Sequence, residues 1–522
     1  MSALEASRDA GAVLAALGVV ALLDVVPLPV RPAARRAGGL VAALAGSGVM
    51  LGTLVPGDAA DALRSPAGAG AAAVALVVLA GLAYGGVRAV LGRPWIWFVL
   101  LALALPVRIP VTLGGEEANL LVPLYAVIGL GLLAWVAARA RGLPAGLVDP
   151  PPAAAGPRTP LDLPIAAFVG FLVLSTLWSA DSEEAAKKVV FFYVPFVLLY
   201  LLVVAWWPSA RRALGALALT TIALAVPLAA LALAQYGTRD IFWNVTLQQA
   251  NVYSRFFRVN SIFYDPNIFG RFLVIALLAA LAVAATRTRR RELAALAGAA
   301  AVAAAGLMVT FSRSSALMLM LVLALVAAWS FGVRRTALVA GAVLVVVAAG
   351  AIATNEPVRE AITSADRLER VSEGRFDLAR GGLSIWRDAP AVGVGLGGFE
   401  TRFNETLTPI EQRRTRVLIS HNAPVTVLSE GGVVGFALFA FLLASAGAAV
   451  ARGNRALGQA GFARWTLLAA LAGIVVHSML YSALFEDPYT WAIVGAAIAL
   501  GAPRPGSAPS PAPEVTRPVP VP

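Results

Sequence analysis

The chain has 522 residues, of which 59% are hydrophobic and only 13% charged, and its mean hydropathy is +0.80. Soluble domains carry about 25% charged residues, so this composition excludes a water-soluble protein and indicates an integral membrane protein. Cysteine is absent and the only histidines are His421 and His477, which excludes disulfides, a thiol nucleophile and a cysteine- or histidine-rich metal centre. We therefore expect no cofactor and no metal site.

The net charge of +12 comes mainly from arginine, because only Lys187 and Lys188 are lysines. Much of the arginine lies in short clusters between apolar runs, which is typical of cytoplasmic loops in membrane proteins. We therefore reject nucleic acid as a partner and expect membrane lipids instead. The excess of Arg, Ala, Gly and Pro indicates a GC-rich bacterial genome. The first residues, with Arg8 set against Glu5 and Asp9, do not resemble a signal peptide.

Apolar runs long enough to cross a membrane follow one another along almost the whole chain. Since a spanning helix needs about 20 apolar residues, we predict an all-α fold, a polytopic transmembrane helical bundle of about 14–15 spans. The expected spans are 10–30, 38–55, 69–87, 94–111, 119–138, 161–179, 188–207, 213–234, 266–285, 293–311, 314–331, 336–354, 424–450, 465–482 and 488–502.

Basic clusters orient this bundle, because arginine and lysine favour the cytoplasmic side of the membrane. The clusters expected on that side are 211–212, 287–291, 334–335 and 452–455. Because successive spans cross the membrane in opposite directions, this orientation places the long segment 355–420 outside. An odd number of spans would place the N-terminus outside as well.

Composition also divides the chain into parts. A Pro-rich segment is expected to be a cytoplasmic linker, and the Pro-rich tail is expected to be disordered. The expected parts are N-terminal helices 1–93, helices 94–141, the linker 142–160, core helices 161–354, the outer loop 355–420, C-terminal helices 421–502 and the tail 503–522.

The outer loop 355–420 is dense in charge, with ten arginines balanced by ten acidic residues. A loop of this length is usually functional or independently structured. Within it we predict an amphipathic helix at 375–387, because apolar residues recur there at helical spacing. These residues are Phe376, Ala379, Leu383 and Trp386. GVGLGGF (393–399) follows as a turn, and without a preceding strand or a following Lys-Ser/Thr it does not indicate a nucleotide site.

Two residues have a setting that suits chemistry. His421 lies in SHNAPVTVLSEGGVVGF, where the outer loop re-enters the membrane, and a neutral imidazole can accept a proton from a sugar hydroxyl. The alternative is an interfacial histidine at a helix start. Arg313, in TFSRSS, lies at an outer turn, where arginine is unusual. Its guanidinium matches phosphate oxygens, although reaching toward lipid headgroups is the simpler alternative.

Weaker candidates lie near these two. Arg375 begins the predicted loop helix and either contacts a phosphate or pairs with a neighbouring acid in water. Arg258 and Arg271, in FRVNSIFYDPNIFGRF, are candidates of the same kind. His477, in VVHSMLYSALFEDP, is interpreted as a packed, hydrogen-bonded histidine rather than a catalyst. No acidic pair suggests a divalent metal site.

Four segments, in their order along the chain, resemble the O-antigen ligase and polymerase superfamily. They are FYDPNIFGRFL (263–273), TFSRSS (310–315), GRFDLARGGLSIWRDAPAVGVGLGGF (374–399) and HNAPVTVLSEGGVVGF (421–436). The likeness covers residues 94–500, so the helices of 1–93 are extra to it, as is the Pro-rich linker. It implies a GT-C-like helical fold and metal-independent glycosyl transfer from an undecaprenyl-pyrophosphate-linked glycan donor.

The resemblance also implies roles for single residues. The family pattern has an Arg in its SR turn, an Arg in the GR…W segment of the loop and a His before Asn. These positions fall on Arg313, Arg375 and His421, which are the expected catalytic residues. The expected substrate-binding residues are Arg258, Arg271, Asn422 and Glu430.

Several functions remain open at this point. The acceptor is expected to be a saccharide or lipid in a ligase, another lipid-linked glycan in a polymerase, or a protein hydroxyl, and fold does not separate these. We expect a multi-pass protein of the bacterial inner membrane with its active site on the extracytoplasmic face. A polysaccharide or lipid transporter is the alternative from another class. It would bury ionisable residues mid-membrane and show an inverted repeat, whereas the spans, apart from Asp24, are largely free of charge.

Overall fold

The computed structural model describes residues 3–26, 32–55, 65–113, 116–141, 159–206, 210–254, 256–332, 375–407, 420–452, 459–481 and 483–501. The first half contains α1 (Ala3–Leu22), α2 (Pro32–Gly52), α4 (Pro66–Gly92), α5 (Trp95–Ala104), β1 (Ile109–Leu113), β2 (Glu116–Leu120), α6 (Val122–Ala140), α7 (Asp162–Leu174), a 3-10 turn η1 (Ser175–Trp178), α8 (Ser182–Lys188), a π-helical turn η2 (Val189–Tyr193), α9 (Val194–Ala205) and α10 (Ala210–Thr238). The second half contains α11 (Val245–Tyr253), α12 (Pro266–Ala284), α13 (Arg290–Val309), α14 (Arg313–Phe331), α18 (Arg375–Asp388), α19 (Gly398–Glu405), α21 (Ala423–Arg452), α22 (Gln459–Ser478) and α23 (Pro488–Gly501).

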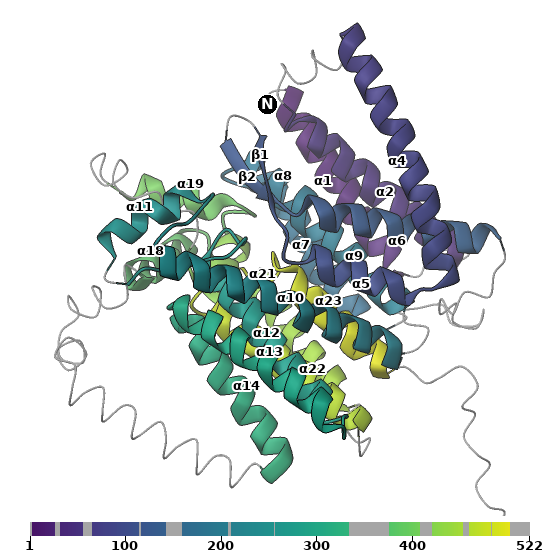
Figure 1. Ribbon diagram of the computed structural model, residues 1–522. Helices are drawn as coiled ribbons and strands as arrows, with labels where there is room; N and C mark the ends of the chain where they lie inside the picture. Colours follow the sequence, from purple (N-terminus) through teal and green to yellow (C-terminus); the bar gives the residue numbers. More distant parts are fainter. Residues whose placement is uncertain are drawn as a thin grey trace, which may run out of the picture.

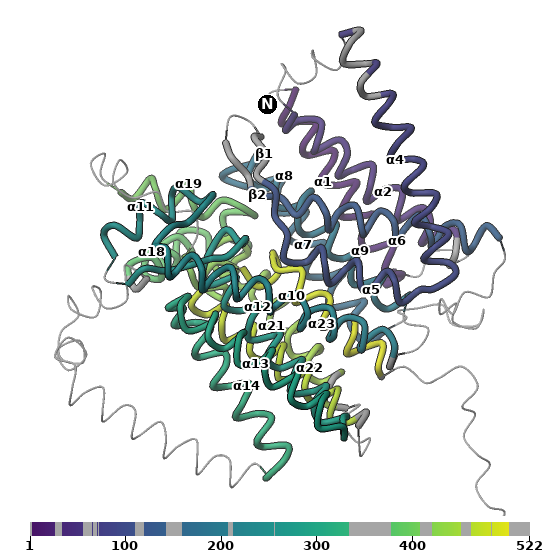
Figure 2. Tube along the Cα trace, viewed as in Figure 1, coloured from purple at the N-terminus to yellow at the C-terminus, as the bar shows by residue number. Residues whose placement is uncertain are grey.

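Long helices run side by side through the molecule, and the short elements gather at one end (Figures 1 and 2). That end carries β1, β2, α11, α18 and α19, and we call it the loop end. In the described part of the chain, nine helices are long and apolar enough to cross a membrane. The predicted fold class, a polytopic helical bundle, is therefore confirmed. The expected span 336–354, the linker up to residue 158 and the tail beyond residue 501 lie outside the described residues.

The expected span 94–111 is wrong in its last third. The helix α5 ends at Ala104, and Ile109–Leu113 pairs antiparallel with Glu116–Leu120 as a two-stranded hairpin. Pro106 and Pro110 explain the difference, because proline lacks the N–H that a helix needs and also restricts the residue before it. The intervening β-branched residues then favour an extended strand.

The N-terminal helices form a tightly packed pair on the side of the bundle. Glycines on both helices allow this approach: a Cβ at Gly46 of α2 would lie 2.5 Å from the backbone nitrogen of Ala15 in α1. The expected first span 10–30 is displaced, since α1 ends at Leu22. Asp24 then adopts a positive φ of 59° and forms buried ion pairs with Arg35 (3.0 Å) and Arg36 (2.6 Å).

Arg8 fixes the direction of this pair relative to the rest of the chain. Its Nη1 donates to the hydroxyl of Ser182 at 3.1 Å, and its Nη2 lies 3.4 Å from Glu183. Both partners begin α8, and Asp181, the N-cap residue of α8, accepts a hydrogen bond from Thr401 in α19 (3.3 Å). The start of α1 therefore lies at the loop end.

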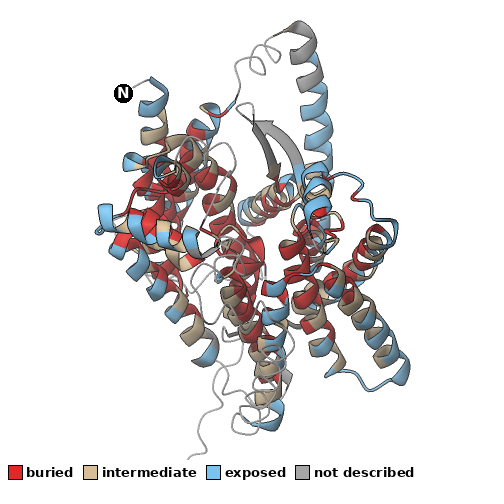
Figure 3. Ribbon diagram, turned by 90° about the vertical axis from the view of Figure 1, so that its left-hand side faces the viewer, coloured by how far each residue is buried: buried red, intermediate tan, exposed pale blue. Residues whose placement is uncertain are grey.

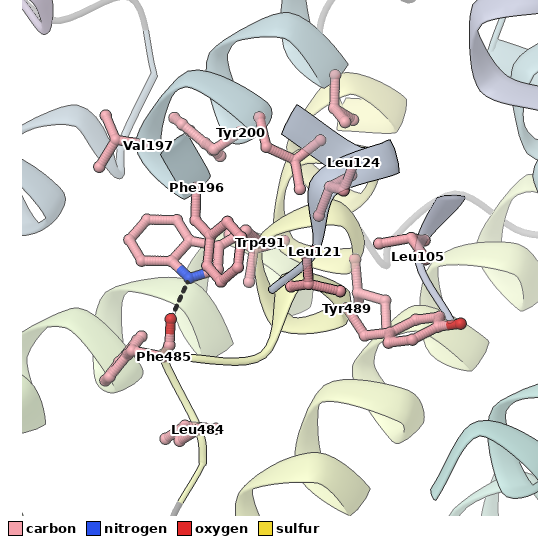
Figure 4. Packing of buried hydrophobic residues seen from close by; sticks show 14 of the residues in the cluster. Leu105, Leu121, Leu124, Phe196, Val197, Tyr200, Leu484, Phe485, Tyr489 and Trp491 are labelled. Carbon is pink, nitrogen blue, oxygen red and sulfur yellow. Dashed lines mark hydrogen bonds between the residues drawn. The ribbon is translucent and has the colours of Figure 1, made fainter. Parts of the chain in front are cut away.

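The core is a continuous apolar cluster in the middle of the bundle. Buried residues line the inward faces of the helices, whereas exposed residues cover the outside (Figure 3). Figure 4 shows Trp491 beside Phe196, with the indole nitrogen of Trp491 donating to the carbonyl of Phe485 at 2.9 Å. Large apolar side chains of α4, such as Leu79 at 62% exposed, face outward, as expected where lipid tails replace water.

Candidate functional site

The TFSRSS turn joins α13 to α14 at the loop end. Ser312 is the N-cap of α14, and its hydroxyl accepts the backbone N–H of Ser315 at 3.2 Å. Arg313 is the first helical residue and is exposed. A helix N-terminus attracts anions through its unpaired N–H groups and its dipole. The turn therefore presents a guanidinium beside a helix start that favours negative charge, as expected for a phosphate contact.

The FYDPN segment holds this turn from a second helix. Asn267 lies in the first turn of α12, and its Oδ1 accepts hydrogen bonds from the Ser312 hydroxyl (2.8 Å) and from Nη2 of Arg258 (3.0 Å). Arg258 also donates through Nε to the carbonyl of Thr310 at 3.1 Å. The structure thus brings together two motifs predicted from sequence, and it places Arg258 on the backbone of the turn that carries Arg313.

Gly270 explains how α12 and α14 approach each other closely enough for these bonds. A Cβ at this position would lie 2.5 Å from the hydroxyl oxygen of Ser315. Any larger residue would push the two helices apart.

His477 contacts the same turn from a third helix, α22. It is 0% exposed, and its Nε2 lies 3.0 Å from the hydroxyl oxygen of Ser314 and 3.3 Å from that of Ser315. Its ring centroid lies 6.0 Å from that of Tyr481. The interpretation of His477 as a packed, hydrogen-bonded histidine agrees with these contacts.

His421 also lies close to Tyr481. The two ring centroids are 6.2 Å apart, and His421 is half-buried with a φ of 54°. A positive φ is uncommon for residues other than glycine, and strained residues gather at functional sites. The next residue, Asn422, starts α21 by accepting the backbone N–H of Val425 (3.1 Å), and its Nδ2 donates to the carbonyl of Met479 (3.1 Å). His421 is thus held at a helix start and faces the segment that follows His477.

Arg271 points inward rather than toward an open surface. It is 1% exposed, its Nε lies 2.9 Å from Asp487, and its Nη1 donates to the carbonyl of Ala483 at 3.4 Å. Asp487 in turn accepts the backbone N–H of Tyr489 at the start of α23 (3.0 Å). The pair therefore ties α12 to the loop that contains Tyr481.

Glu430 belongs to a buried ion cluster a short way along α21. Its carboxylate lies 3.2 Å from Nζ of Lys188, which also lies 3.7 Å from Glu486. Lys188 and Glu430 are 7% and 5% exposed. Burial raises the pKa of the Glu486 carboxyl, and the positive charge of Lys188 opposes that rise. The cluster joins α8, α21 and the loop before α23.

The glycine run 393–399 is a structural turn rather than a phosphate loop. The amide of Val394 donates to the carbonyl of Ser429 (3.0 Å), and that of Gly395 donates to the carbonyl of Glu430 (2.9 Å). The amide of Leu396 donates to the hydroxyl of Ser175 at 3.0 Å. These backbone N–H groups therefore already donate hydrogen bonds to protein oxygens, so they do not form a phosphate-binding loop. The carbonyls of Ser429 and Glu430 in α21 can accept these hydrogen bonds because the helix is kinked at Gly432, where φ is 62°.

The predicted loop helix is present as α18, but its buried face differs from the prediction. Leu383 is 37% exposed, whereas Ile385 is 3% exposed and packs with Phe399 and Phe403. The prediction missed this face because it chose Leu383 and Trp386 to define the apolar side and left out Ile385. The neighbouring Gly382 leaves room for Val425 of α21, so this glycine lies on the buried side.

The backbone of Arg375 begins α18, as predicted, but its side chain lies outside the described part of the chain. Whether Arg375 and Arg313 share one cavity therefore stays a prediction, as do the catalytic and substrate-binding roles. In the part of the chain that the structure describes, no group of three or more His, Asp or Glu side chains is placed to hold a metal ion.

Sequence reasoning missed several charged or aromatic groups around Tyr481. Burial and the nearby Asp265 raise the pKa of the Tyr481 phenol, whereas Arg108 and Arg271 lower it. Tyr481 therefore keeps its proton at neutral pH and can act as a hydrogen-bond donor. Arg108 was detectable, since it is an arginine at the expected outer end of the predicted span 94–111, which is the signal that singled out Arg313. Tyr481 had no comparable signal.

The fold and this site define a polytopic helical membrane protein with an arginine and histidine cluster at one end of its bundle. Residues 298–440 match the family model described as O-Antigen ligase. The match includes the positions of Arg313, Arg375 and His421, confirms the resemblance, and supports membership of the O-antigen ligase and polymerase superfamily. At the family level it supports a membrane glycosyltransferase of that kind. No curated protein matches the chain.

Proposed function

We propose that the chain transfers a glycan from an undecaprenyl-pyrophosphate-linked donor to a saccharide or lipid acceptor at the outer face of the bacterial inner membrane. The observation that carries the proposal is the link between the TFSRSS turn, which contains Arg313, and the segment that begins with His421. Ser314, next to Arg313, bonds His477, and the rings of His477 and His421 both lie about 6 Å from the ring of Tyr481, at 6.0 and 6.2 Å. An anion-binding turn and a half-buried histidine thus belong to one connected site.

The chemistry assigned to this site needs one base and one anion clamp. His421 accepts the proton of the acceptor hydroxyl as the acceptor oxygen attacks the anomeric carbon of the donor sugar. The bond between that carbon and the pyrophosphate oxygen breaks, and undecaprenyl pyrophosphate leaves with the bonding electrons. Arg313, with Arg375, stabilises the negative charge that develops on the leaving group. A single displacement of this kind inverts the anomeric centre.

The remaining predicted residues fit supporting roles in this proposal. Arg258 holds the turn that carries Arg313, and Asn422 fixes the helix start beside His421. Arg271 and Glu430 are engaged in buried ion pairs, so we assign Arg271 to positioning the loop around Tyr481 and Glu430 to joining α8 to α21. A buried charge left without its partner is strongly destabilising, which suits residues that must fix geometry.

The test is transfer by the purified chain in lipid nanodiscs. Undecaprenyl-pyrophosphate-linked oligosaccharide and a candidate acceptor are supplied, and the glycosylated acceptor and free undecaprenyl pyrophosphate are quantified. We expect equal amounts of the two products, with or without EDTA, because arginines rather than a metal ion stabilise the leaving group. Movement of intact donor across the bilayer without either product would support a transporter instead. Restoration of EDTA-inhibited transfer by a divalent ion would contradict the role of the arginines.

The acceptor decides between ligase and polymerase. The same assay with a second lipid-linked glycan as the only acceptor distinguishes them, because a polymerase then lengthens the chain on the lipid. A ligase leaves that acceptor unchanged and requires a different one.

A further inference from the structure

His477 is a buried polar side chain to which the proposed chemistry assigns no role. It lies in the last turn of α22, is 0% exposed, and bonds through Nε2 to a different helix, α14. Its partners, Ser314 and Ser315, directly follow Arg313 in the sequence. Complete burial prevents His477 from touching a substrate, so any effect on transfer must pass through its neighbours.

The turn that His477 contacts needs support from outside. Phe311 in this turn has a φ of 49°, and such a conformation persists only where surrounding contacts hold it. Asn267 bonds Ser312, just before Arg313, and His477 bonds Ser314, just after it. Arg313 is therefore fixed between two side-chain hydrogen bonds that come from two other helices.

The segment after His477 contacts the second half of the site. The Tyr481 ring lies at 62° to the His477 ring and at 43° to the His421 ring, with centroid distances of 6.0 and 6.2 Å. The carbonyl of Met479 accepts a hydrogen bond from Asn422, the neighbour of His421. His477, Met479 and Tyr481 thus contact the surroundings of the proposed clamp and the proposed base.

We propose that His477 is a positioning residue, which sets Arg313 for the donor pyrophosphate through Ser314 and holds Tyr481 against His421. The inference rests on the proposed function. It predicts that losing the His477–Ser314 bond weakens donor binding at the turn, because Arg313 is then no longer held on its C-terminal side. A hydrogen bond of this kind corresponds to a roughly 3- to 10-fold change in affinity.

The experiment compares His477→Phe, His477→Gln and Ser314→Ala with Ser478→Ala as the matched control. Ser478 is also 0% exposed and is the next residue along the chain, but its hydroxyl donates to the carbonyl of Ile474 in its own helix. Phenylalanine keeps a ring against Tyr481 and removes the bond to Ser314. Glutamine keeps a polar group that can replace that bond. Binding of undecaprenyl pyrophosphate, the donor KM, kcat and thermal unfolding are measured for each.

We expect His477→Phe and Ser314→Ala to raise the donor KM and weaken undecaprenyl pyrophosphate binding to a similar extent. The double variant should be no worse than either single variant, because both remove the same contact. His477→Gln should recover most of the affinity, and Ser478→Ala should behave as wild type. Additive losses, or a lower unfolding temperature with an unchanged KM, would overturn the inference by showing a general packing role.

The experiment distinguishes failure of the proposed function from failure of the positioning role of His477. A wild-type chain that binds undecaprenyl pyrophosphate but transfers nothing contradicts the proposed function, whereas the binding comparison still decides the role of His477. Normal transfer and normal binding by both His477→Phe and Ser314→Ala contradict the positioning role alone.

Discussion

A guanidinium offers a planar fork that can pair with two phosphate oxygens, whereas a lysine ammonium is a point charge. Arg313 is exposed at the N-terminus of α14, so Arg313→Lys should preserve charge and fold but lose the fork. We expect transfer to fall by about 100-fold, the scale typical of losing one charge-stabilising donor. Arg375→Lys should show a loss of the same order.

The control for these variants is Arg290→Lys, at the exposed start of α13. This change should leave the transfer rate unaltered. Wild-type rates for both Arg313→Lys and Arg375→Lys would reduce the two arginines to markers of topology.

His421 has a positive φ, and this limits the choice of variant. Asparagine tolerates such a backbone conformation better than most residues, so His421→Asn removes the base with little added strain. General-base assistance contributes about 10²–10⁴-fold, and we expect a loss of that size in kcat for both His421→Asn and His421→Ala. Undecaprenyl pyrophosphate binding and thermal unfolding serve as controls. A well-folded variant within a few-fold of the wild-type rate would exclude the role.

Among single residues, the sequence identified those that lie in short motifs and missed those whose contacts are with residues distant in the sequence. Arg258, Arg313 and His421 lie in segments whose spacing carries the signal, and the structure places Arg258 on the turn of Arg313. Lys188 ends the short charged segment SEEAAKK, and Tyr481 lies in a largely apolar one, and neither segment carries a recognisable motif. Their importance comes from partners on other helices, such as Glu430, and no local pattern encodes that pairing.

Among the elements, the glycine run between α18 and α19 makes the most specific prediction. Gly395 has a φ of 85°, and a Cβ there would lie 2.7 Å from the carbonyl oxygen of Ser175. Gly395→Ala should therefore lower stability by about 1–3 kcal/mol through backbone strain alone, with a further cost from the clash. Thermal unfolding of the purified protein measures the effect.

The matched control is Gly85→Ala in α4, where a Cβ would meet nothing within 4 Å. Alanine is the better helix former by about 1 kcal/mol, so this variant should unfold at the same or a slightly higher temperature. Equal behaviour of the two alanine variants would show that the glycine run is not a packed structural turn.

Elements that depend on long apolar runs were predictable, because the bilayer itself dictates about 20 apolar residues per span. Elements at the ends of spans were not. The segment 94–111 is apolar enough to span, but its prolines end the helix at Ala104, and a hairpin strand begins at Ile109. The buried face of α18 was misplaced because Gly382 lies on it, and hydrophobic periodicity does not register a glycine that makes room for a neighbour.

For the whole molecule, the loop end brings together segments that are far apart in the chain. Thr401 bonds Asp181, and Leu396 bonds Ser179 and Ser175. Arg8 adds the start of the chain to the same end. The arginine-rich turn at 287–291 joins α12 to α13, a full helix length from the TFSRSS turn. The structure and the positive-inside pattern therefore agree on two faces.

Labelling tests this orientation directly. Because the chain contains no cysteine, single variants Arg380→Cys, Arg289→Cys and Ala6→Cys each present one thiol to a membrane-impermeant maleimide in intact spheroplasts. Arg380 and Ala6 are exposed at the loop end, and Arg289 is exposed in the opposite turn. We expect labelling of Arg380→Cys and Ala6→Cys, and labelling of Arg289→Cys only after the membrane is permeabilised. If Arg380→Cys and Arg289→Cys labelled alike, the topology and an outward-facing site would both be wrong. If only Ala6→Cys were protected, the contact of Arg8 with α8 would be contradicted and the placement of the loop retained.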